Sequence, residues 1–139
     1  MKLSAVGEDG WTYIMGTAQA IAYERMLESK REDRLFNDHL AQHFCGEKGE
    51  GISKFITDAM KLMMKGPITD DYNYRHTAAR TKLINDHLDK WITETQATGT
   101  KMQITNLGAG CDTRAFWFDS LSNVERYVEV DDAIVINAK

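Results

Sequence analysis

The first hundred residues carry apolar side chains at the spacing of amphipathic helices. Four helices are predicted, over residues 17–30, 37–44, 52–65 and 74–96. Gly66 and Pro67 end the third helix, because glycine and proline are poor continuations of a helix. The pattern therefore predicts a mainly helical first part of the chain.

Each of these helices has an apolar side that we expect to be buried. The glycine-rich segment 46–51 is predicted to be a connecting loop, because no strand precedes it and it contains two glutamates. The expected buried positions are Ala18, Ile21, Ala22 and Met26 in the first helix, Leu40 and Phe44 in the second, Ile52, Phe55, Ile56, Ala59, Leu62 and Met63 in the third, and Ala79, Leu83, Ile84, Leu88, Trp91 and Ile92 in the fourth.

The pattern changes after residue 100. Gln103–Leu107 and Arg126–Val130 are short β-rich runs that predict two strands, with a short helix over 113–118 between them. No linker divides the chain, so we expect one unit over residues 1–139. Its first hundred residues would form a helical cap, and residues 101–139 a β/α/β segment.

Composition narrows the classes of function. Of the 139 residues, 42% are hydrophobic and 27% charged, as in folded soluble proteins. The net charge of −4, without a basic block, argues against nucleic acid as the main partner. No run is apolar enough for a signal peptide or a membrane span, so we expect a cytoplasmic protein without a membrane partner.

The cysteines and histidines do not predict a metal site. Cys45 and Cys111 lack CxxC spacing, so we expect neither a disulfide nor bound zinc. His39 and His43 lie one helical turn apart, but HLAQH lacks the glutamate of HExxH, which favours surface histidines. The mixed charges at 30–34 are typical of a solvated helix end.

Candidate chemistry lies between residues 104 and 131. The first strand leads into Gly108 and Gly110, which let backbone approach a ligand at the carboxyl end of the strand. Asp131 ends the second strand at about the spacing, roughly 20 residues, of an acid that binds ribose hydroxyls. Glu129 is the alternative ribose acid, because residues two apart on a strand share a face.

The glycine spacing favours a nucleoside ligand without pyrophosphate. The dinucleotide fingerprint requires a third glycine where this chain has Thr113. S-adenosylmethionine suits the pattern better, since it offers a ribose to the acid and an amino-acid end to the glycine turn. A lone Gly-x-Gly is otherwise often only a turn.

These residues resemble a known family. NLGAGCDTRAF at 106–116 and YVEVD at 127–131 resemble the NLGAG-x-DTR and EVD motifs of leucine carboxyl methyltransferases and related bacterial O-methyltransferases. Upstream, ESKREDRLFNDHLA at 28–41 and AART at 78–81 match family phrases in the same order. The resemblance covers nearly the whole chain from residue 17 onward.

The resemblance implies roles for single residues. Arg80 would pair with the carboxylate of S-adenosylmethionine, Gly108 would lie against its backbone, and Asp131 would hold the ribose. Without the resemblance, Arg80 would be interpreted as a solvated helix arginine. Asp112 is expected to cap the following short helix and Arg114 to pair internally. No catalytic residue is assigned.

The implied fold is α/β, with an N-terminal helical cap followed by the start of a Rossmann-like methyltransferase sheet, truncated after the second strand. Trp117 and Phe118 are expected in the core beneath the sheet. The implied reaction is methyl transfer to a carboxylate or hydroxyl of a small molecule. The alternatives are methylation of a protein's C-terminal leucine carboxylate, and a non-catalytic remnant or interaction module.

The resembling enzymes continue for a comparable length again. We therefore expect the 139-residue chain alone to be inactive and to self-associate through open strand edges.

Overall fold

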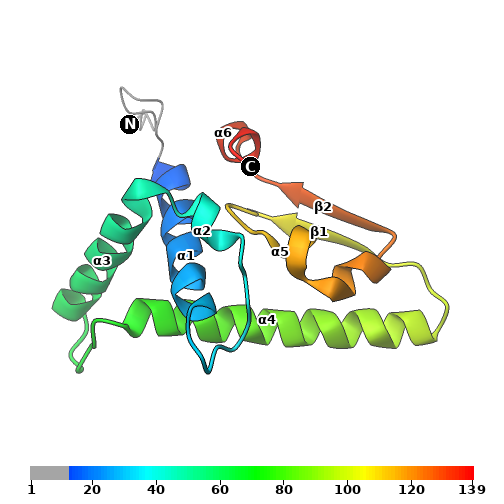
Figure 1. Ribbon diagram of the computed structural model, residues 1–139, viewed down its shortest axis with the longest axis horizontal. Coiled ribbons are helices and arrows are strands. Elements are labelled where there is room, and N and C mark those ends of the chain that lie inside the picture. The colour runs from blue at the N-terminus through cyan, green and yellow to red at the C-terminus, as the bar shows by residue number, and fades with distance from the viewer. Residues whose placement is uncertain (1–12) are drawn as a thin grey trace.

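A computed structural model describes residues 13–139 of the chain. Within these residues, four helices come first and a β/α/β segment follows, so the fold is mixed α/β with most described residues in helices (Figure 1). The elements are α1 (Tyr13–Ser29), α2 (Ala41–Phe44), α3 (Gly46–Met63), α4 (Tyr72–Ala97), β1 (Gln103–Leu107), α5 (Arg114–Trp117), the 3₁₀ helix η1 (Asp119–Asn123), β2 (Arg126–Val130) and α6 (Ala133–Asn137).

The two strands form a parallel pair with the predicted bounds. Gln103 lies opposite Arg126 at one end of the ladder, and Leu107 lies opposite Val130 at the other. The long helix α4 runs along one side of the molecule, with α5 and the strands next to one half of it and α1 and α3 next to the other (Figure 1). This arrangement places the carboxyl ends of both strands close to α1.

Helix α1 lies at the centre and contacts α2, α3, α4 and α6. Its alanines allow close approach: Ala18 and Ala22 are buried, as predicted, and pack against Cys111. Charged side chains on the same helix, Glu24 and Arg25 among them, are also buried. Helix α1 is therefore enclosed on several sides, and its buried surface is partly polar.

The predicted loop at 46–51 is wrong, because these residues form the first turns of α3. Gly49 shows why glycine occurs in this part of the helix. A Cβ atom at this position would lie 2.7 Å from the backbone oxygen of Gln19, so only glycine lets α3 approach α1 this closely. Gly46 has a φ of +56° at the start of the helix, a conformation that also favours glycine.

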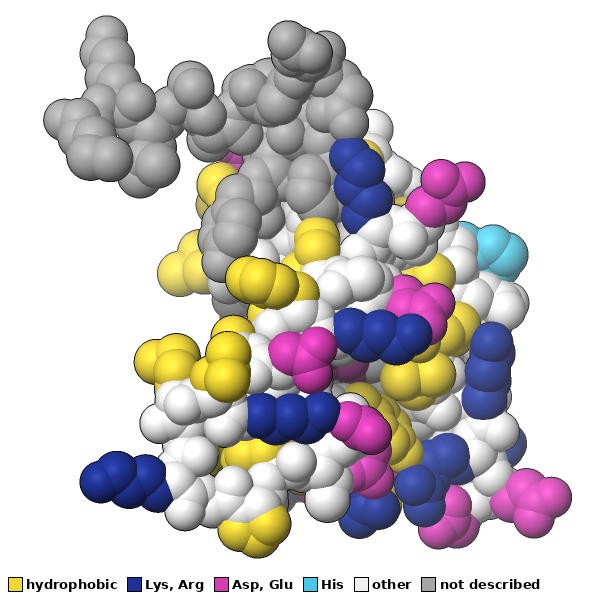
Figure 2. Space-filling view, turned by 90° about the vertical axis from the view of Figure 1, so that its left-hand side faces the viewer, with side chains coloured by type: hydrophobic (Ala, Val, Ile, Leu, Met, Phe, Trp, Pro, Cys, Tyr) yellow, Lys and Arg dark blue, Asp and Glu magenta, His cyan; other side chains and the backbone are white. Residues whose placement is uncertain are grey.

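The predicted buried face of α3 is also wrong. Phe55 and Leu62 are 73% and 89% exposed, and the helix instead buries Gly49, Ser53 and Thr57. The reason lies on α1, where a buried glutamate accepts a hydrogen bond from Ser53. Figure 2 views the molecule from the side of α3 and shows hydrophobic side chains at the surface between charged ones.

In helix α4, too, most of the side that was expected to be buried is exposed. Leu83, Ile84 and Trp91 are exposed, although Ile92 is buried as predicted. The remaining buried positions of the helix are small or polar, and they include Thr77 and Asn85, whose side chains form hydrogen bonds with groups of α1 and α5. Polar contacts thus decide which face of α4 is covered.

Two shorter predictions need adjustment. The helix expected over 37–44 spans only Ala41–Phe44. Residues 39–40 form a turn before it, and the Asp38 carboxylate accepts a hydrogen bond from the Ala41 amide across this turn. Trp117 is half-buried, stacks on Phe36 and contacts Phe118, which is also half-buried. These aromatic rings therefore pack against the segment before α2 and are not fully enclosed.

The charged residues at 30–34 follow the end of α1 and lie mostly at the surface, as predicted. His39 and His43 are exposed. Within residues 13–139, no helix combines the length and apolar character needed to cross a lipid bilayer.

Candidate functional site

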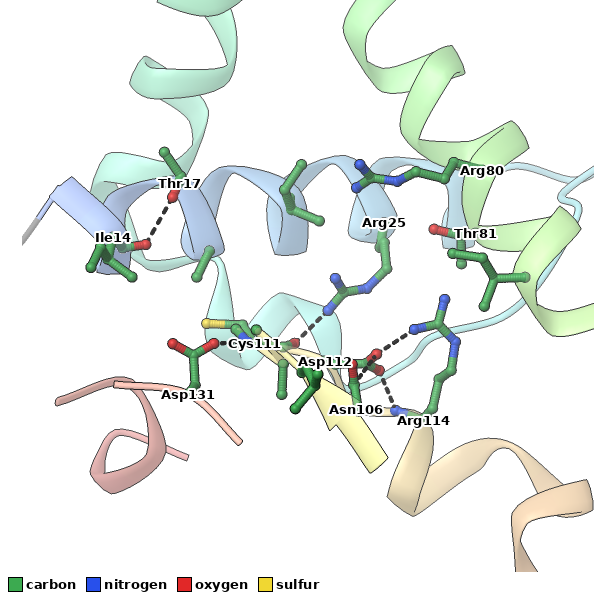
Figure 3. Close-up of a pocket in the computed structure, with 17 residues that line it drawn as sticks. Ile14, Thr17, Arg25, Arg80, Thr81, Asn106, Cys111, Asp112, Arg114 and Asp131 are labelled. Atoms are coloured by element: carbon green, nitrogen blue, oxygen red, sulfur yellow. Dashed lines mark hydrogen bonds and ion pairs between the residues drawn. The ribbon is translucent and has the colours of Figure 1, made fainter. Parts of the chain in front are cut away.

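A pocket of about 540 Å³ opens at the carboxyl ends of β1 and β2, between α1, α4 and the loop after β1. The structure brings all four predicted site residues to it, and Figure 3 shows the side chains that line it. They are Arg80 from α4, Gly108 and Gly110 from the loop after β1, and Asp131 from the end of β2. Its volume is within the range of small-molecule sites.

The loop after β1 turns at its two glycines. Gly108 and Gly110 have φ values of +66° and +53°, where side chains are disfavoured. A Cβ at Gly110 would lie 3.3 Å from that of Ala18, so this glycine also permits close packing on α1. A Cβ at Gly108 would meet no atom within 4 Å, which leaves room beside the loop for a ligand.

Asp131 joins the end of β2 to this loop. One carboxylate oxygen accepts a hydrogen bond of 2.6 Å from the Gly110 amide, and the other accepts one of 2.7 Å from the Asp132 amide. Each oxygen has two lone pairs, so the carboxylate keeps capacity for further donors. Asp131 therefore holds the glycine loop and still presents an acceptor to the pocket.

Glu129, the alternative acid, is not among the residues that line the pocket. One of its oxygens accepts a hydrogen bond of 2.6 Å from Lys139. Its other oxygen, Oε1, is buried and has no hydrogen-bond partner among the described residues. The geometry thus places Asp131, and not Glu129, where a ligand in the pocket could be reached.

Three arginines line the pocket, and their partners differ. Arg25 pairs with Asp38, and Arg114 pairs with Asp112. The guanidinium of Arg80 is exposed and forms no hydrogen bond or ion pair with any residue in the described part of the chain. Arg80 is therefore the pocket arginine that is ready to bind an anionic ligand.

The internal pairing predicted for Arg114 is confirmed, and Asp112 binds the first amide of α5 from the position before the N-cap residue, Thr113. Asp112 accepts a hydrogen bond of 2.9 Å from the Arg114 amide at the start of α5, and its carboxylate pairs with the Arg114 guanidinium. Arg114 also donates to Asn85 of α4, at 2.7 Å. Asn106 of β1 donates to Asp112 at 3.0 Å. These contacts fix α5 and the loop to the strand and to α4.

Sequence reasoning missed two buried charges at this site. Arg25 of α1 and Asp38 of the segment before α2 form an ion pair whose side chains are 7% and 0% exposed. Arg25 also donates to the Cys111 carbonyl of the glycine loop. For Arg25 the sequence signal was its position one helical turn after Ile21 and Ala22, on the apolar side of α1.

Two ionisable groups near the strands have altered pKa values. Burial raises the pKa of the Cys111 thiol. Burial, reinforced by the nearby Asp112 carboxylate, raises the pKa of Tyr127 to about 12. Both groups therefore hold their protons at neutral pH.

The raised pKa of Tyr127 predicts a loss of stability at alkaline pH. Tyr127 binds its proton more tightly in the folded state than in the unfolded state. Its contribution to the free energy of unfolding is therefore complete below about pH 10, the ordinary tyrosine pKa, and is lost as pH rises through a pKa of about 12. We expect the unfolding free energy in urea to fall by about 2 kcal/mol more in the unmodified chain than in Tyr127→Phe over this window. Equal slopes for the two proteins would contradict the shift.

Taken together, the pocket offers an unpaired guanidinium, a carboxylate acceptor and a glycine turn with open space beside it. A guanidinium binds a carboxylate with two parallel hydrogen bonds. A carboxylate accepts from a pair of hydroxyls. The arrangement suits a ligand with an anionic group at one end and a ribose at the other.

Several known proteins are similar to this chain, and they carry the same description. A Streptomyces coelicolor protein named as an S-adenosyl-L-methionine-dependent methyltransferase is 36% identical, over 79% of this chain and 37% of that protein. A Streptomyces avermitilis protein of the same name is 32% identical, over 91% of this chain and 41% of that protein. A Parafrankia protein, which carries the same description, is 34% identical, over 78% of this chain and 33% of that protein. The matched part spans well under half the length of these relatives.

No solved structure gives a significant match to the chain. The model of one protein family, described as leucine carboxyl methyltransferase, matches residues 18–139. This match begins in α1 and includes every residue that lines the pocket except Ile14 and Thr17. The chain belongs to the leucine carboxyl methyltransferase family.

Proposed function

We propose that the pocket binds S-adenosyl-L-methionine and that the protein transfers its methyl group to an oxygen of a small molecule. The observation that carries this proposal is Arg80, a guanidinium without an ion-pair partner in residues 13–139, which lines the same pocket as Asp131. The family and the names of the relatives support the choice of ligand.

The residues of the pocket fit this cofactor. Arg80 would bind the carboxylate of its amino-acid end, as arginine does through two parallel donors. Asp131 would accept from the ribose hydroxyls with the lone pairs that Gly110 and Asp132 leave free. Gly108 would let the cofactor lie against the backbone, where no atom would meet even a Cβ.

In this proposal the protein contributes alignment. The bound cofactor supplies a methyl group that its sulfonium already activates. Arg80 and Asp131 would fix the amino-acid end and the ribose of the ligand, on either side of the sulfonium, so that an acceptor oxygen can approach the methyl group in line. A carboxylate acceptor has no proton to lose and needs no general base, whereas a hydroxyl acceptor would have to pass its proton to a base or to water.

We prefer a small-molecule carboxylate or hydroxyl as the acceptor, because DTRAF at 112–116 resembles the bacterial branch of the family. The alternative acceptor that we consider is a protein's C-terminal leucine carboxylate. We further propose that β1 and β2 are the first strands of a Rossmann-like sheet, since they are parallel and carry the pocket at their carboxyl ends. A cytoplasmic location remains a prediction.

The test of this function is the ligand dependence of Arg80→Ala. The variant is expected to weaken binding of S-adenosylmethionine and S-adenosylhomocysteine by roughly tenfold or more, the value of hydrogen bonds to a charged group. Adenosine, which lacks the carboxylate, should bind almost unchanged. Titration followed by NMR measures all three ligands, including weak ones.

Arg75→Ala is the matched control, since Arg75 is an exposed arginine of the same helix that pairs with Asp71 and does not line the pocket. It should leave all three affinities unchanged. Equal losses for the three ligands in Arg80→Ala would assign Arg80 to the fold, and no binding of any of them to the unmodified chain would refute the proposed cofactor for this chain.

The 139-residue chain by itself is expected to bind the cofactor weakly and to show no turnover. In the described residues, β1 and β2 pair only with each other, and Leu107 and Val130 are exposed on one face of the sheet. Exposed strand edges invite pairing with other chains. Sedimentation velocity should reveal concentration-dependent self-association. Methyl transfer from labelled cofactor by purified monomer would contradict this expectation.

A further inference from the structure

The glycine loop of the pocket is bound by a buried ion pair that comes from elsewhere in the chain. Arg25 Nε donates to Asp38 Oδ2 at 2.9 Å, and another nitrogen of the same guanidinium donates to the Cys111 carbonyl at 2.5 Å. Figure 3 shows Arg25 reaching from α1 to this carbonyl. The arginine thus contacts the loop directly.

Asp38 makes a second contact with the same loop. Its Oδ1 accepts a hydrogen bond of 2.6 Å from the Thr113 hydroxyl, which is fully buried, and one of 3.1 Å from the Ala41 amide. The Asp38 amide in turn donates to the Ser29 hydroxyl at the end of α1. Asp38 therefore connects the segment before α2 with the residue at which the glycine loop enters α5.

Stability alone does not account for this arrangement. Burying two charges costs desolvation energy that their attraction often only offsets, so a buried ion pair contributes little net stability compared with apolar packing. It does define geometry, because a guanidinium and a carboxylate with several fixed partners allow few alternative positions. Both charges also direct one of their contacts to the loop after β1.

We propose that Arg25 and Asp38 are positioning residues that fix the conformation of the glycine loop, residues 108–113, through Cys111 and Thr113. Together with Asp131, which binds the Gly110 amide from β2, they hold the loop from three separate segments. This inference rests on the proposed function for its significance, because the loop forms one wall of the proposed cofactor pocket.

The variants separate loop positioning from general stability. Arg25→Lys keeps the charge but offers a single nitrogen, which cannot reproduce the two separately directed contacts of the guanidinium. Thr113→Val removes the donor to Asp38 at nearly constant volume, whereas Thr113→Ser restores a hydroxyl. Glu24→Gln is the matched control, because Glu24 is the neighbouring buried charge of α1 and contacts Ser53, Asn73 and Thr77 but not the loop.

The measurement is amide hydrogen exchange by NMR on the 139-residue chain without ligand. The loop reporters are the amides of Gly110 and Asp112, which donate to Asp131 and to the Ala109 carbonyl, and the references are amides of the β1–β2 ladder. In Arg25→Lys and Thr113→Val, exchange of the loop amides is expected to accelerate about tenfold relative to the ladder, the effect of losing one internal hydrogen bond.

In Thr113→Ser and Glu24→Gln, the ratio of loop to ladder exchange should stay near that of the unmodified chain. The proposal is overturned if loop and ladder accelerate together in Arg25→Lys and Thr113→Val, if neither changes, or if Glu24→Gln accelerates the loop as strongly. If Arg25→Lys does not fold, the comparison of Thr113→Val with Thr113→Ser still tests the proposal. Because no cofactor is present, the result is independent of the Arg80 titrations.

Discussion

Replacing Asp131 with alanine is expected to weaken binding of S-adenosylmethionine by tenfold to over a hundredfold, which corresponds to about 1.5 to 3 kcal/mol for hydrogen bonds to a charged group. The upper part of this range is expected, because the substitution removes two roles. It deletes the proposed acceptor for the ribose, and it releases the Gly110 amide that Asp131 binds at 2.6 Å. NMR titration, which also detects weak binding, measures the loss.

Two further variants divide these roles. Asp131→Asn retains an oxygen that can accept from the Gly110 amide but removes the negative charge, so its loss should be smaller than that of alanine. Glu129→Ala should leave the affinity nearly unchanged, because Glu129 does not line the pocket. Unchanged affinity in Asp131→Ala together with a loss in Glu129→Ala would transfer the ribose role to Glu129.

Replacing Glu24 with alanine is expected to reduce the free energy of unfolding by about 3 kcal/mol, because buried donors would lose their acceptor. Glu24 is fully buried and accepts hydrogen bonds from Ser53 at 2.6 Å, Asn73 at 2.7 Å and Thr77 at 2.5 Å. These contacts join α1 to α3 and α4. Urea unfolding followed by circular dichroism measures the change.

Glu32→Ala is the control for this substitution, since Glu32 is an exposed glutamate just after α1. It should change stability by no more than about 0.5 kcal/mol, as is usual for surface positions. Glu24→Gln, which retains an acceptor oxygen, should fall between the two. A loss in Glu24→Ala no larger than that of Glu32→Ala would show that the three donors find other partners.

The sequence was sufficient to predict the sheet and the position of the pocket. Strands Gln103–Leu107 and Arg126–Val130 have their predicted bounds, because short β-rich runs between glycines and polar residues are a local signal. Parallel strands end at the same edge, so Gly108, Gly110 and Asp131 had to lie close together. Arg80 was found through the family resemblance, and the structure places it at the same pocket.

The covered faces of the helices were decided only by tertiary structure. Hydrophobic spacing assigned Phe55, Leu62 and Leu83 to the interior, yet all three are exposed. Helix α1 carries buried carboxylates, and a buried carboxylate requires hydrogen-bond donors. Ser53 and Thr77 provide them, which turns the polar sides of α3 and α4 inward.

The ion pair between Arg25 and Asp38 could not be predicted from local sequence pattern either. Arg25, Asp38 and Thr113 come from three segments, and the contact between Asp38 and Thr113 joins residues 75 positions apart. Periodicity reports which residues share one side of one helix or strand. It carries no information about which charge on another segment will meet them, because that depends on how the segments pack. The sequence by itself therefore determined the two strands, the longer helices and the edge where a ligand would bind. The packing around α1 determined where α3 begins and which polar groups are buried there.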